Sequence, residues 1–457
     1  MSAQPCPGPS WAASLAFVTR RFSTLPDYFL ELARRYGPVS RLHGMRADVY
    51  LFDESDAIED LLVTKARSFI KGRGIQRLRR LIGNGLLTSE PPEHIANRRL
   101  VQPAFHRKRI EAYGAGMIAA AQRRLAAWND GDEIEVEHES MRITLDIAAE
   151  TLFGGADLSA DTEGIGSALT AVMETFPASV APFGEVLDVF PFLPITQKFR
   201  RARAQLDATV ERLIAEHRRS RDDSGDVLSL LLAARDEDGS GLSDEQIRDE
   251  VMTILIAGHE TTAVAISWTI YLLQRHPEDA ARIVAQLDAV LGGRRPALDD
   301  APALTLVRAA FSESMRLYPP AWLIGRVATE PVELGGYQLK KHDVALVCQY
   351  VTHRNPRYWP EPGSFSLERW LDGAKPPEKF AYFPFGGGNR ICIGEGFAWL
   401  EGVLVLATLL QQARFELIDA AAVGLAPLVT LRPANPIRAR VRVRSPHRAP
   451  ASAAAPR

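Results

Sequence analysis

FGGGNRICIG, residues 385–394, is the stretch around which the rest of the chain is organised. Three consecutive glycines leave the backbone bare, and Arg390, Cys392 and Gly394 follow them. An apolar helical pattern then begins at Phe397 and runs to Leu410. Because glycine permits positive φ and carries no side chain, a flat ligand can approach this backbone closely. The cysteine therefore stands between a permissive loop and the N-terminus of a helix.

A thiol at a helix N-terminus is favoured as thiolate, because the dipole and free N–H groups lower its pKa. Such a thiolate suits a soft metal centre as an axial ligand. The residues alone leave other interpretations open: a small buried apolar cysteine, a plain glycine turn or a phosphate cradle. No Lys-Ser or Lys-Thr follows the glycines, which disfavours phosphate. The chain has only Cys6, Cys348 and Cys392, none closely paired, which disfavours zinc and disulfides.

Composition narrows the class of protein. The chain has 457 residues, of which 46% are apolar and 24% charged, as in ordinary soluble globular proteins. The net charge of −2 gives no bulk attraction to nucleic acid, so we expect no such partner. No run reaches the roughly 18 apolar residues of a membrane span, and the short apolar run at 11–18 lacks a basic start. We expect a cytoplasmic monomer without a membrane span, in agreement with its scattered cysteines.

The pattern predicts a mainly α protein with a smaller β-rich part. We expect a loop segment over residues 1–24, one large domain over 25–444 and a disordered Ala/Pro/Ser-rich tail over 445–457. An apolar, proline-rich loop is expected over 176–194. Helices are expected at 26–36, 55–64, 91–101, 110–128, 140–153, 162–175, 197–219, 243–275, 277–291 and 302–317. Strands are expected at 39–42, 49–52, 133–136, 327–332, 337–339, 344–350, 428–431 and 437–443.

The longest helix opens with a capping pattern at Ser243 and continues to about Arg275. About 30 residues of helix span about 45 Å, the width of a domain. The pattern is apolar nearly all round from Val251 to Leu273, so this helix should cross the core. It contains the sequence AGHETT at 257–262.

An acid and two hydroxyls midway along a buried helix need partners, because a buried carboxylate is costly. One interpretation is a face that touches solvent, with threonine bonded to the carbonyl four residues earlier. A zinc-protease pattern is excluded, because Ala263 and not histidine stands four residues after His259.

The loop at 385–394 resembles the haem-binding loop of the cytochrome P-450 family, in which Phe, Gly, Arg, Cys and Gly recur at this spacing. Phe385, Gly388, Arg390, Cys392 and Gly394 fill those places here. The resemblance implies the triangular single-domain fold of that family, soluble and of bacterial type. It also implies haem b, with iron bound by the Cys392 thiolate and Phe385, Arg390 and Gly394 lining the cofactor.

The same resemblance assigns roles in the long helix and in a structural triad. It implies that small residues at 257–258 leave room for dioxygen, that Thr261 positions water and that Glu260 links the site to solvent as a proton relay. Glu313 and Arg316 alone would be a commonplace helical pair. The family pattern implies that both are buried and bonded to Arg369.

Cations for the haem propionates are implied on three segments. His94 and Arg98 lie one turn apart on the helix at 91–101, where a solvated basic face is the simpler interpretation. The resemblance implies that these two residues, Arg326 and Arg390 approach the propionates, since buried carboxylates must be paired.

The remaining implications concern partners and reaction. The basic run at 107–109 is either a solvated face or, by resemblance, the docking site of a ferredoxin or flavodoxin-type donor that brings electrons from NAD(P)H. The resemblance also implies that substrate contacts come from the segments at 72–87, 176–194, 255–256 and 321–324. These are largely apolar, apart from the basic residues of the first, which implies a lipophilic substrate such as a fatty acid, terpenoid or carotenoid. We expect a haem-thiolate monooxygenase that inserts one oxygen atom of O₂, using two external electrons. The alternatives are a peroxide-using or isomerase/dehydratase member of the fold, or a non-catalytic haem protein.

Overall fold

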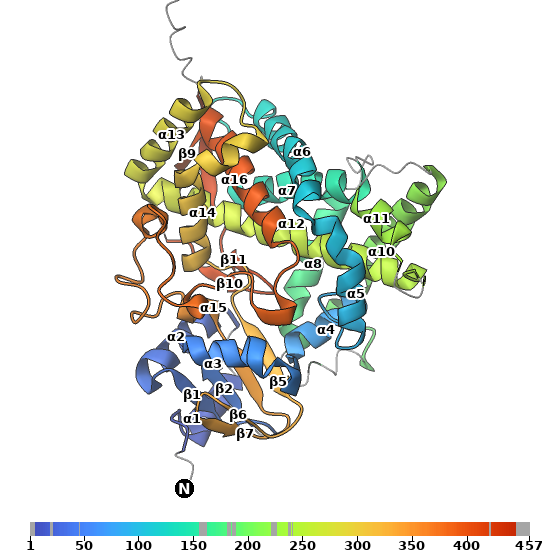
Figure 1. Cartoon of the computed structure of the whole chain (residues 1–457), viewed down its shortest axis with the longest axis vertical. Coiled ribbons are helices and arrows are strands. Elements are labelled where there is room, and N and C mark those ends of the chain that lie inside the picture. Colours follow the sequence, from blue (N-terminus) through green and yellow to red (C-terminus); the bar gives the residue numbers. More distant parts are fainter. Residues whose placement is uncertain are drawn as a thin grey trace, which may run out of the picture.

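Helix α12, Asp244–Arg275, crosses the middle of the molecule in the computed structural model (Figure 1). The structure describes residues 5–18, 22–44, 46–154, 162–180, 184, 189–220, 226–235, 239, 241–419 and 422–444. The predicted capping box is confirmed: Gln246 N–H donates to Ser243 Oγ (3.2 Å), and Ser243 N–H donates to Gln246 Oε1 (2.8 Å). In length and composition α12 is the one described helix that could cross a membrane, but 78% of that segment is buried inside the protein.

The other helices form the bulk of the molecule, and α7, α14 and α16 pack directly on α12. Their bounds are α1 Trp11–Val18, α2 Leu25–Tyr36, α3 Ser55–Glu59, α4 Arg73–Ile82, α5 Glu93–Val101, α6 Arg107–Ala126, α7 Val136–Phe153, α8 Thr162–Val180, α10 Pro194–Ser220, α11 Val227–Ala233, α13 Pro277–Leu291, α14 Thr305–Leu317, α15 Gln349–Thr352 and α16 Glu395–Gln412.

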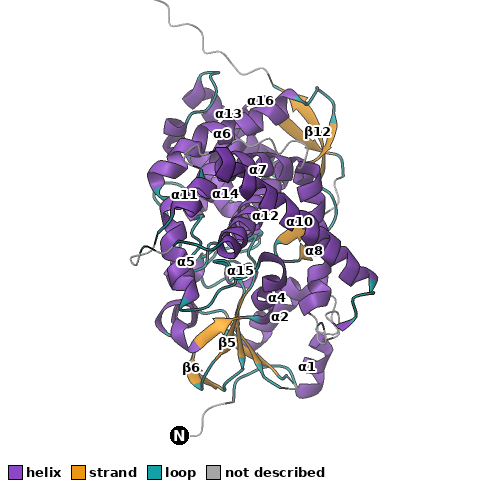
Figure 2. Cartoon of the chain, turned by 90° about the vertical axis from the view of Figure 1, so that its right-hand side faces the viewer, coloured by secondary structure: helices purple, strands orange, loops and turns teal. Residues whose placement is uncertain are grey.

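Most strands lie at the two ends of the molecule (Figure 2), whereas β10 and β11 lie near its middle (Figure 1). They are β1 Val39–Leu42, β2 Val49–Phe52, β3 Phe69–Lys71, β4 Glu133–Glu135, β5 Ile324–Ala328, β6 Val332–Leu334, β7 Tyr337–Leu339, β8 Val344–Val347, β9 Ala413–Leu417, β10 Leu425–Pro427, β11 Leu431–Pro433 and β12 Arg438–Val443. A five-stranded sheet, β1-β2-β8-β5-β3, lies near the N-terminus, and the sheet β4-β12-β9 lies at the opposite end. The prediction of a mainly α protein with a smaller β-rich part is confirmed, and the strands form four small sheets in the part of the chain that the structure describes.

The register of the five-stranded sheet brings distant charges together. Strand β3 pairs antiparallel with β5, which sets Lys71 directly opposite Arg326. Directly opposed residues in a sheet have neighbouring side chains, so two cations meet at this edge. Most of the helices lie between this sheet and the sheet β4-β12-β9 (Figure 2).

Two apolar clusters divide the core along α12. One surrounds the C-terminal half of α12, where the Trp268 ring is fully buried and stacks on Tyr318 with centroids 4.0 Å apart. The other joins the N-terminal half of α12 to α4, α8, α10 and α11. Apolar clusters surround α12 on most sides, which explains why its sequence from Val251 to Leu273 is apolar nearly all round.

Several predicted elements differ from the observed ones. The N-terminal segment contains α1, because the alanines and leucine after Pro9 favour helix over loop. Strand β3 and helix α4 lie in the arginine-rich segment at 67–84, for which the sequence predicts no helix or strand. Helix α8 continues past Thr175 and through Pro177 to Val180, so the predicted loop at 176–194 begins later.

The remaining differences lie in that loop and near the C-terminus. Positions 181–183 and 185–188 of the loop, and the predicted tail at 445–457, are outside the described residues. The predicted strand at 428–431 is mostly a turn between β10 and β11, closed by the Leu428 N–H, which donates to Thr430 O (2.9 Å).

Candidate active site

The loop before α16 requires glycine at two positions. Gly386 has φ 74° and Gly388 has φ 66°, both in the left-handed region. A Cβ on Gly388 would lie 2.0 Å from the Leu62 carbonyl oxygen, so no other residue fits there. The Cys392 N–H donates to Phe385 O (3.0 Å) and closes the loop. The cysteine is thus presented by a backbone that cannot easily change shape.

The Cys392 side chain, between the glycine loop and helix α16, is exposed in the structure. Even so, burial raises the pKa of its thiol. The Gly394 backbone N–H, at the N-cap of α16, opposes that rise by hydrogen bonding to sulfur. The expectation that the helix end would lower the thiol pKa is wrong for the free thiol, because burial outweighs it. A bound metal cation reverses this order, since a coordinating thiol is deprotonated.

A window of small side chains opens in α12. Ala257, Gly258 and Thr261 are partly accessible in the middle of a helix whose central residues are mostly buried. A Cβ added to Gly258 would meet no atom within 4 Å, so this face of the helix borders open space. The Thr261 hydroxyl donates to Ala257 O (2.6 Å), as one sequence-based interpretation expected. Its oxygen remains able to accept a bond from that space.

Glu260 does not reach solvent. It is 2% exposed, and its Oε1 accepts hydrogen bonds from the Thr430 hydroxyl and from Arg432 Nε (3.0 Å). A carboxylate this deep is stable only in an ion pair, which Arg432 supplies, and the role of Glu260 as a proton relay to solvent stays a prediction. A buried acid signals the need for a partner, but the sequence does not point to Arg432, which lies 172 residues away.

Basic side chains from separate elements gather around one carboxylate, Glu90. Arg390 pairs with Glu90 through Nη2, and its Nη1 donates to Ser89 O (3.1 Å). The Lys71 backbone N–H donates to Glu90 Oε1 (2.7 Å), and its Nζ donates to Ser89 O (2.7 Å). Arg326 lies opposite Lys71 in the sheet. The sequence-based reasoning missed Lys71 and Glu90; a lysine in a short apolar strand was the available signal.

Electrostatics show that this group, which we call the cation cluster (Lys71, His94, Arg98, Arg326 and Arg390), has too much positive charge. Burial and then Arg390 lower the pKa of Lys71 to about 7, that of Arg326 to about 10 and that of His94 to about 3. Glu90 raises the pKa of Lys71 and Arg326 but does not compensate for the repulsion. A ligand with more than one carboxylate would therefore fit.

Helix α5 attaches two members of the cluster to the cysteine loop. His94 and Arg98 lie one turn apart, as predicted, and His94 is buried. Arg98 Nη1 donates to Ile391 O (2.8 Å), next to the cysteine. The predicted propionate residues thus lie together, and a solvated basic face does not describe His94.

The Glu313–Arg316 pair is fully buried. Arg316 Nε and Nη2 each donate to Glu313 at 2.7 Å, and Arg369 Nε lies 3.3 Å from Glu313 Oε1. The Trp370 indole N–H also donates to Glu313 (2.9 Å). The three residues predicted as a triad therefore meet in the structure, and the simpler interpretation of a surface pair is wrong.

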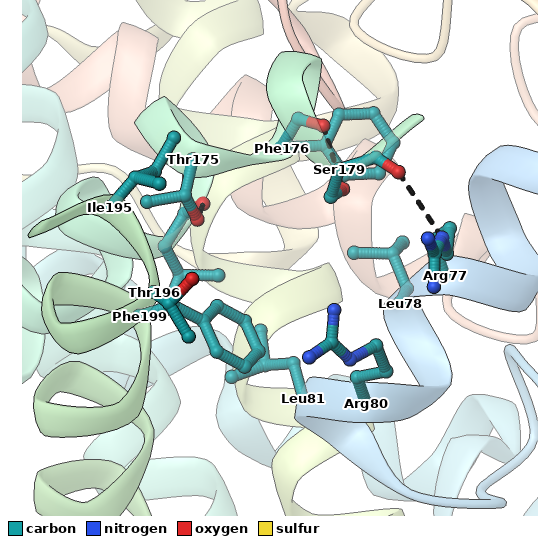
Figure 3. Close-up of a pocket in the computed structure, with 11 residues that line it drawn as sticks. Arg77, Leu78, Arg80, Leu81, Thr175, Phe176, Ser179, Ile195, Thr196 and Phe199 are labelled. Atoms are coloured by element: carbon teal, nitrogen blue, oxygen red, sulfur yellow. Dashed lines mark hydrogen bonds between the residues drawn. The ribbon is translucent and has the colours of Figure 1, made fainter. Parts of the chain in front are cut away.

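A separate pocket lies between α4, α8 and α10 (Figure 3). It is a small hollow of about 40 Å³ between apolar side chains such as Leu78, Leu81 and Phe176. Two arginines also line it: Arg77 Nε donates to Ser179 O (3.1 Å), and the Arg80 guanidinium lies 5.5 Å from the Phe199 ring centre. Two segments predicted to contact substrate thus form one hollow.

Known proteins agree with this architecture. A family model described as Cytochrome P-450 matches residues 5–429. Cyclooctatin synthase from Streptomyces melanosporofaciens is 38% identical and covers 90% of each chain. Pentalenene oxygenase from Streptomyces avermitilis is 33% identical, covering 92% of this chain and 94% of its own. The crystal structure of a cytochrome P-450 haem domain superposes with a TM-score of 0.86 at 28% identity, covering 98% of this chain and 99% of that one.

The fold and the cysteine loop define a haem-thiolate oxidoreductase. The chain belongs to the cytochrome P-450 family. Another similar protein, cyclooctat-9-en-7-ol 5-monooxygenase from Streptomyces melanosporofaciens, is 34% identical and covers 86% of this chain and 85% of its own.

Replacing Glu313 tests the triad. In Glu313→Ala the buried Arg316 loses its counter-ion, which costs about 3–5 kcal/mol. We expect that loss in the free energy of unfolding, measured with urea, and protein that no longer retains haem. Glu368→Ala is the matched control, because Glu368 is exposed and pairs with Arg282 at the surface. Normal stability and haem content in Glu313→Ala would contradict the assignment.

The cation cluster predicts a pH dependence of the haem-free chain. The pKa of Lys71 falls from 10.5 to about 7 on folding, so the unfolded chain binds more protons between those values. Its contribution to the free energy of unfolding should therefore rise with pH across this window. Urea titrations at several pH values should give a flatter profile for Lys71→Met than for wild type, whereas exposed Lys341→Met should match wild type. Parallel profiles for wild type and Lys71→Met would refute the prediction.

Proposed function

We propose that this protein is a monooxygenase that inserts one oxygen atom of O₂ into a terpenoid, with Cys392 as the axial ligand of haem b. The observation that carries the proposal is the geometry of the cysteine loop, in which two left-handed glycines and the Phe385 carbonyl hold Cys392 in an exposed position at the start of α16. When bound, a thiolate-ligated haem supplies the activation of O₂.

The cation cluster fits the two propionates of that group. Lys71, Arg326 and Arg390 share the carboxylate Glu90, and burial and then the charge of Arg390 lower the pKa of Lys71 and Arg326. Two further carboxylates would relieve this repulsion through charge-assisted hydrogen bonds. His94, Arg98, Arg326, Arg390 and Lys71 would hold them. The Phe385 ring packs on Trp399 of α16 with ring centroids 5.6 Å apart, and this contact anchors the loop to the helix.

On the opposite side of the site we assign an oxygen pocket to α12. Ala257 and Gly258 leave the space, and Thr261 presents a hydroxyl oxygen to it. Glu260, directly before Thr261 in the chain, is an acid that can deliver protons, a form of general acid catalysis. Arg432 holds its carboxylate in place.

The substrate proposal rests on relatives and on the pocket. Proteins similar to this chain are named for the oxidation of pentalenene and cyclooctat-9-en-7-ol, both terpenoids. The mostly apolar pocket of Figure 3 suits a lipophilic molecule. Fatty acids and carotenoids are the other substrates that the sequence suggested.

The electron donor proposal rests on the surface near the cysteine loop. Arg107, Lys108 and Arg109 are exposed at the start of α6, which packs along α16. Just before them, Phe105 lies 3.8 Å from where a Cβ on Gly394 would stand. We propose that an acidic ferredoxin or flavodoxin, reduced by NAD(P)H, docks here by charge attraction. A monomer in the cytoplasm remains our proposal for its state.

Spectroscopy tests the ligand. The reduced carbon monoxide complex should show the red-shifted Soret band of a thiolate ligand. We expect Cys392→His to lose that band and Cys6→Ser, a cysteine on a different segment, to retain it. A band at the ordinary histidine-haem position in wild type would overturn the proposal.

Product analysis tests the reaction and substrate. Cyclooctat-9-en-7-ol, pentalenene, a long-chain fatty acid and β-carotene would each be incubated with a surrogate ferredoxin, its reductase and NADPH. We expect a product heavier by one oxygen atom from a terpenoid, with the label of ¹⁸O₂. Product from the fatty acid or carotene alone would replace terpenoid as the substrate class. Product only with hydrogen peroxide would favour the peroxide-using alternative.

A further inference from the structure

Arg432, on β11, lies between two carboxylates. Its Nε is 3.0 Å from Glu260 Oε1 and 3.8 Å from Oε1 of Glu137, on the first turn of α7. The side chains become more exposed along this line: 3% for Glu260, 9% for Arg432 and 20% for Glu137. The three groups thus form a row from the inside of α12 toward the surface.

The separation of the two carboxylates is limited by this geometry. Since both oxygens contact the same nitrogen, they cannot lie further apart than the sum of the two distances. Bridging water can span such a gap. Burial raises the pKa of Glu137 to about 6, Arg432 lowers it and Glu260 raises it further. Glu137 can therefore exchange protons with solvent near neutral pH.

We propose that Glu137 is the outer carboxyl of a proton route to Glu260, with Arg432 holding both groups in position. This inference rests on the proposed function, because only reductive O₂ chemistry consumes protons at the site. Glu137 acts through Glu260 and is not itself a catalytic residue.

This step transfers a proton only, and no electron is gained or lost. A proton passes from the Glu137 carboxyl through water to Glu260, and bulk water returns one to Glu137. Arg432 does not release a proton, because a guanidinium stays charged in proteins. Its role is to keep the inner carboxylate ionised and close to the outer one.

Other charged groups near Glu137 come from the elements packed around it. Glu135 on β4 raises the pKa of Glu137. From α12, His259 is buried, and burial lowers its pKa to about 4. On α7 itself, Glu139 is bonded to Arg124 (2.6 Å) and to the Trp128 indole (3.0 Å). Of these carboxylates, Glu137 is the one that the structure pairs with Arg432.

The test uses the haem-loaded enzyme with the surrogate ferredoxin, its reductase and NADPH. Glu137→Gln removes the titrating proton but keeps the shape, and Glu135→Gln is the neighbouring control. Measured are O₂ consumption, the share of it released as hydrogen peroxide and the solvent deuterium isotope effect, at pH values on both sides of 6. Oxidation of guaiacol by added hydrogen peroxide is measured in parallel, since peroxide brings its own protons.

We expect Glu137→Gln to release several-fold more peroxide per O₂, to lose the pH dependence near 6 and to show a larger isotope effect. Guaiacol oxidation and the carbon monoxide band should not change. Glu135→Gln should keep the wild-type peroxide release and isotope effect, with its pH dependence moved to lower pH because Glu135 raises the pKa of Glu137. Glu137→Asp should regain most of the wild-type behaviour, which a purely structural defect would not permit.

Wild-type values in Glu137→Gln would overturn the inference and leave the proposed function intact. If Glu137→Gln fails to hold haem, Glu137→Asp decides: a normal pH profile supports the route, and a lost one with an intact carbon monoxide band overturns it. No NADPH-driven O₂ consumption in wild type would overturn the proposed function, and this inference with it.

Discussion

The fully buried guanidinium of Arg316 is the group on which the cysteine loop depends. A guanidinium has five N–H donors, and all five are used: two bond to Glu313, and three bond to the carbonyls of His353, Pro362 and Ser364. These bonds fix the segment from 353 to 364, which contains no long helix or strand. The order continues along the chain, because His353 Nε2 accepts from the Phe383 N–H, two residues before the loop begins.

Charge is distributed unequally on the two sides of the site. Cations are in excess around Glu90, where burial and repulsion lower the pKa of several of them. Around Arg432, carboxylates are in excess, and the pKa of Glu137 is raised. The first arrangement suits an anionic ligand, and the second suits groups that exchange protons. Both arrangements use buried charge, which is stable only when partners are supplied.

Local patterns in the sequence predicted much of this structure. The capping box at Ser243, the glycine loop at 386–388 and the bond from Thr261 to the carbonyl four residues earlier involve neighbours in the chain. Partners across the fold were not predictable, because no local rule links Glu260 to Arg432 or Lys71 to Arg326. The thiol pKa was misjudged for a related reason: the helix end is visible in the sequence, but the burial that outweighs it is not.

The pairing of β3 with β5 also bears on how the protein assembles. These strands are separated by more than half of the chain, and joining them closes a very long loop. Contacts between distant segments tend to form late, because loop-closure entropy opposes them. Completing this sheet also sets two like charges, Lys71 and Arg326, side by side. An anionic group bound at this edge would therefore offset a cost of closing the chain here as well as filling the site.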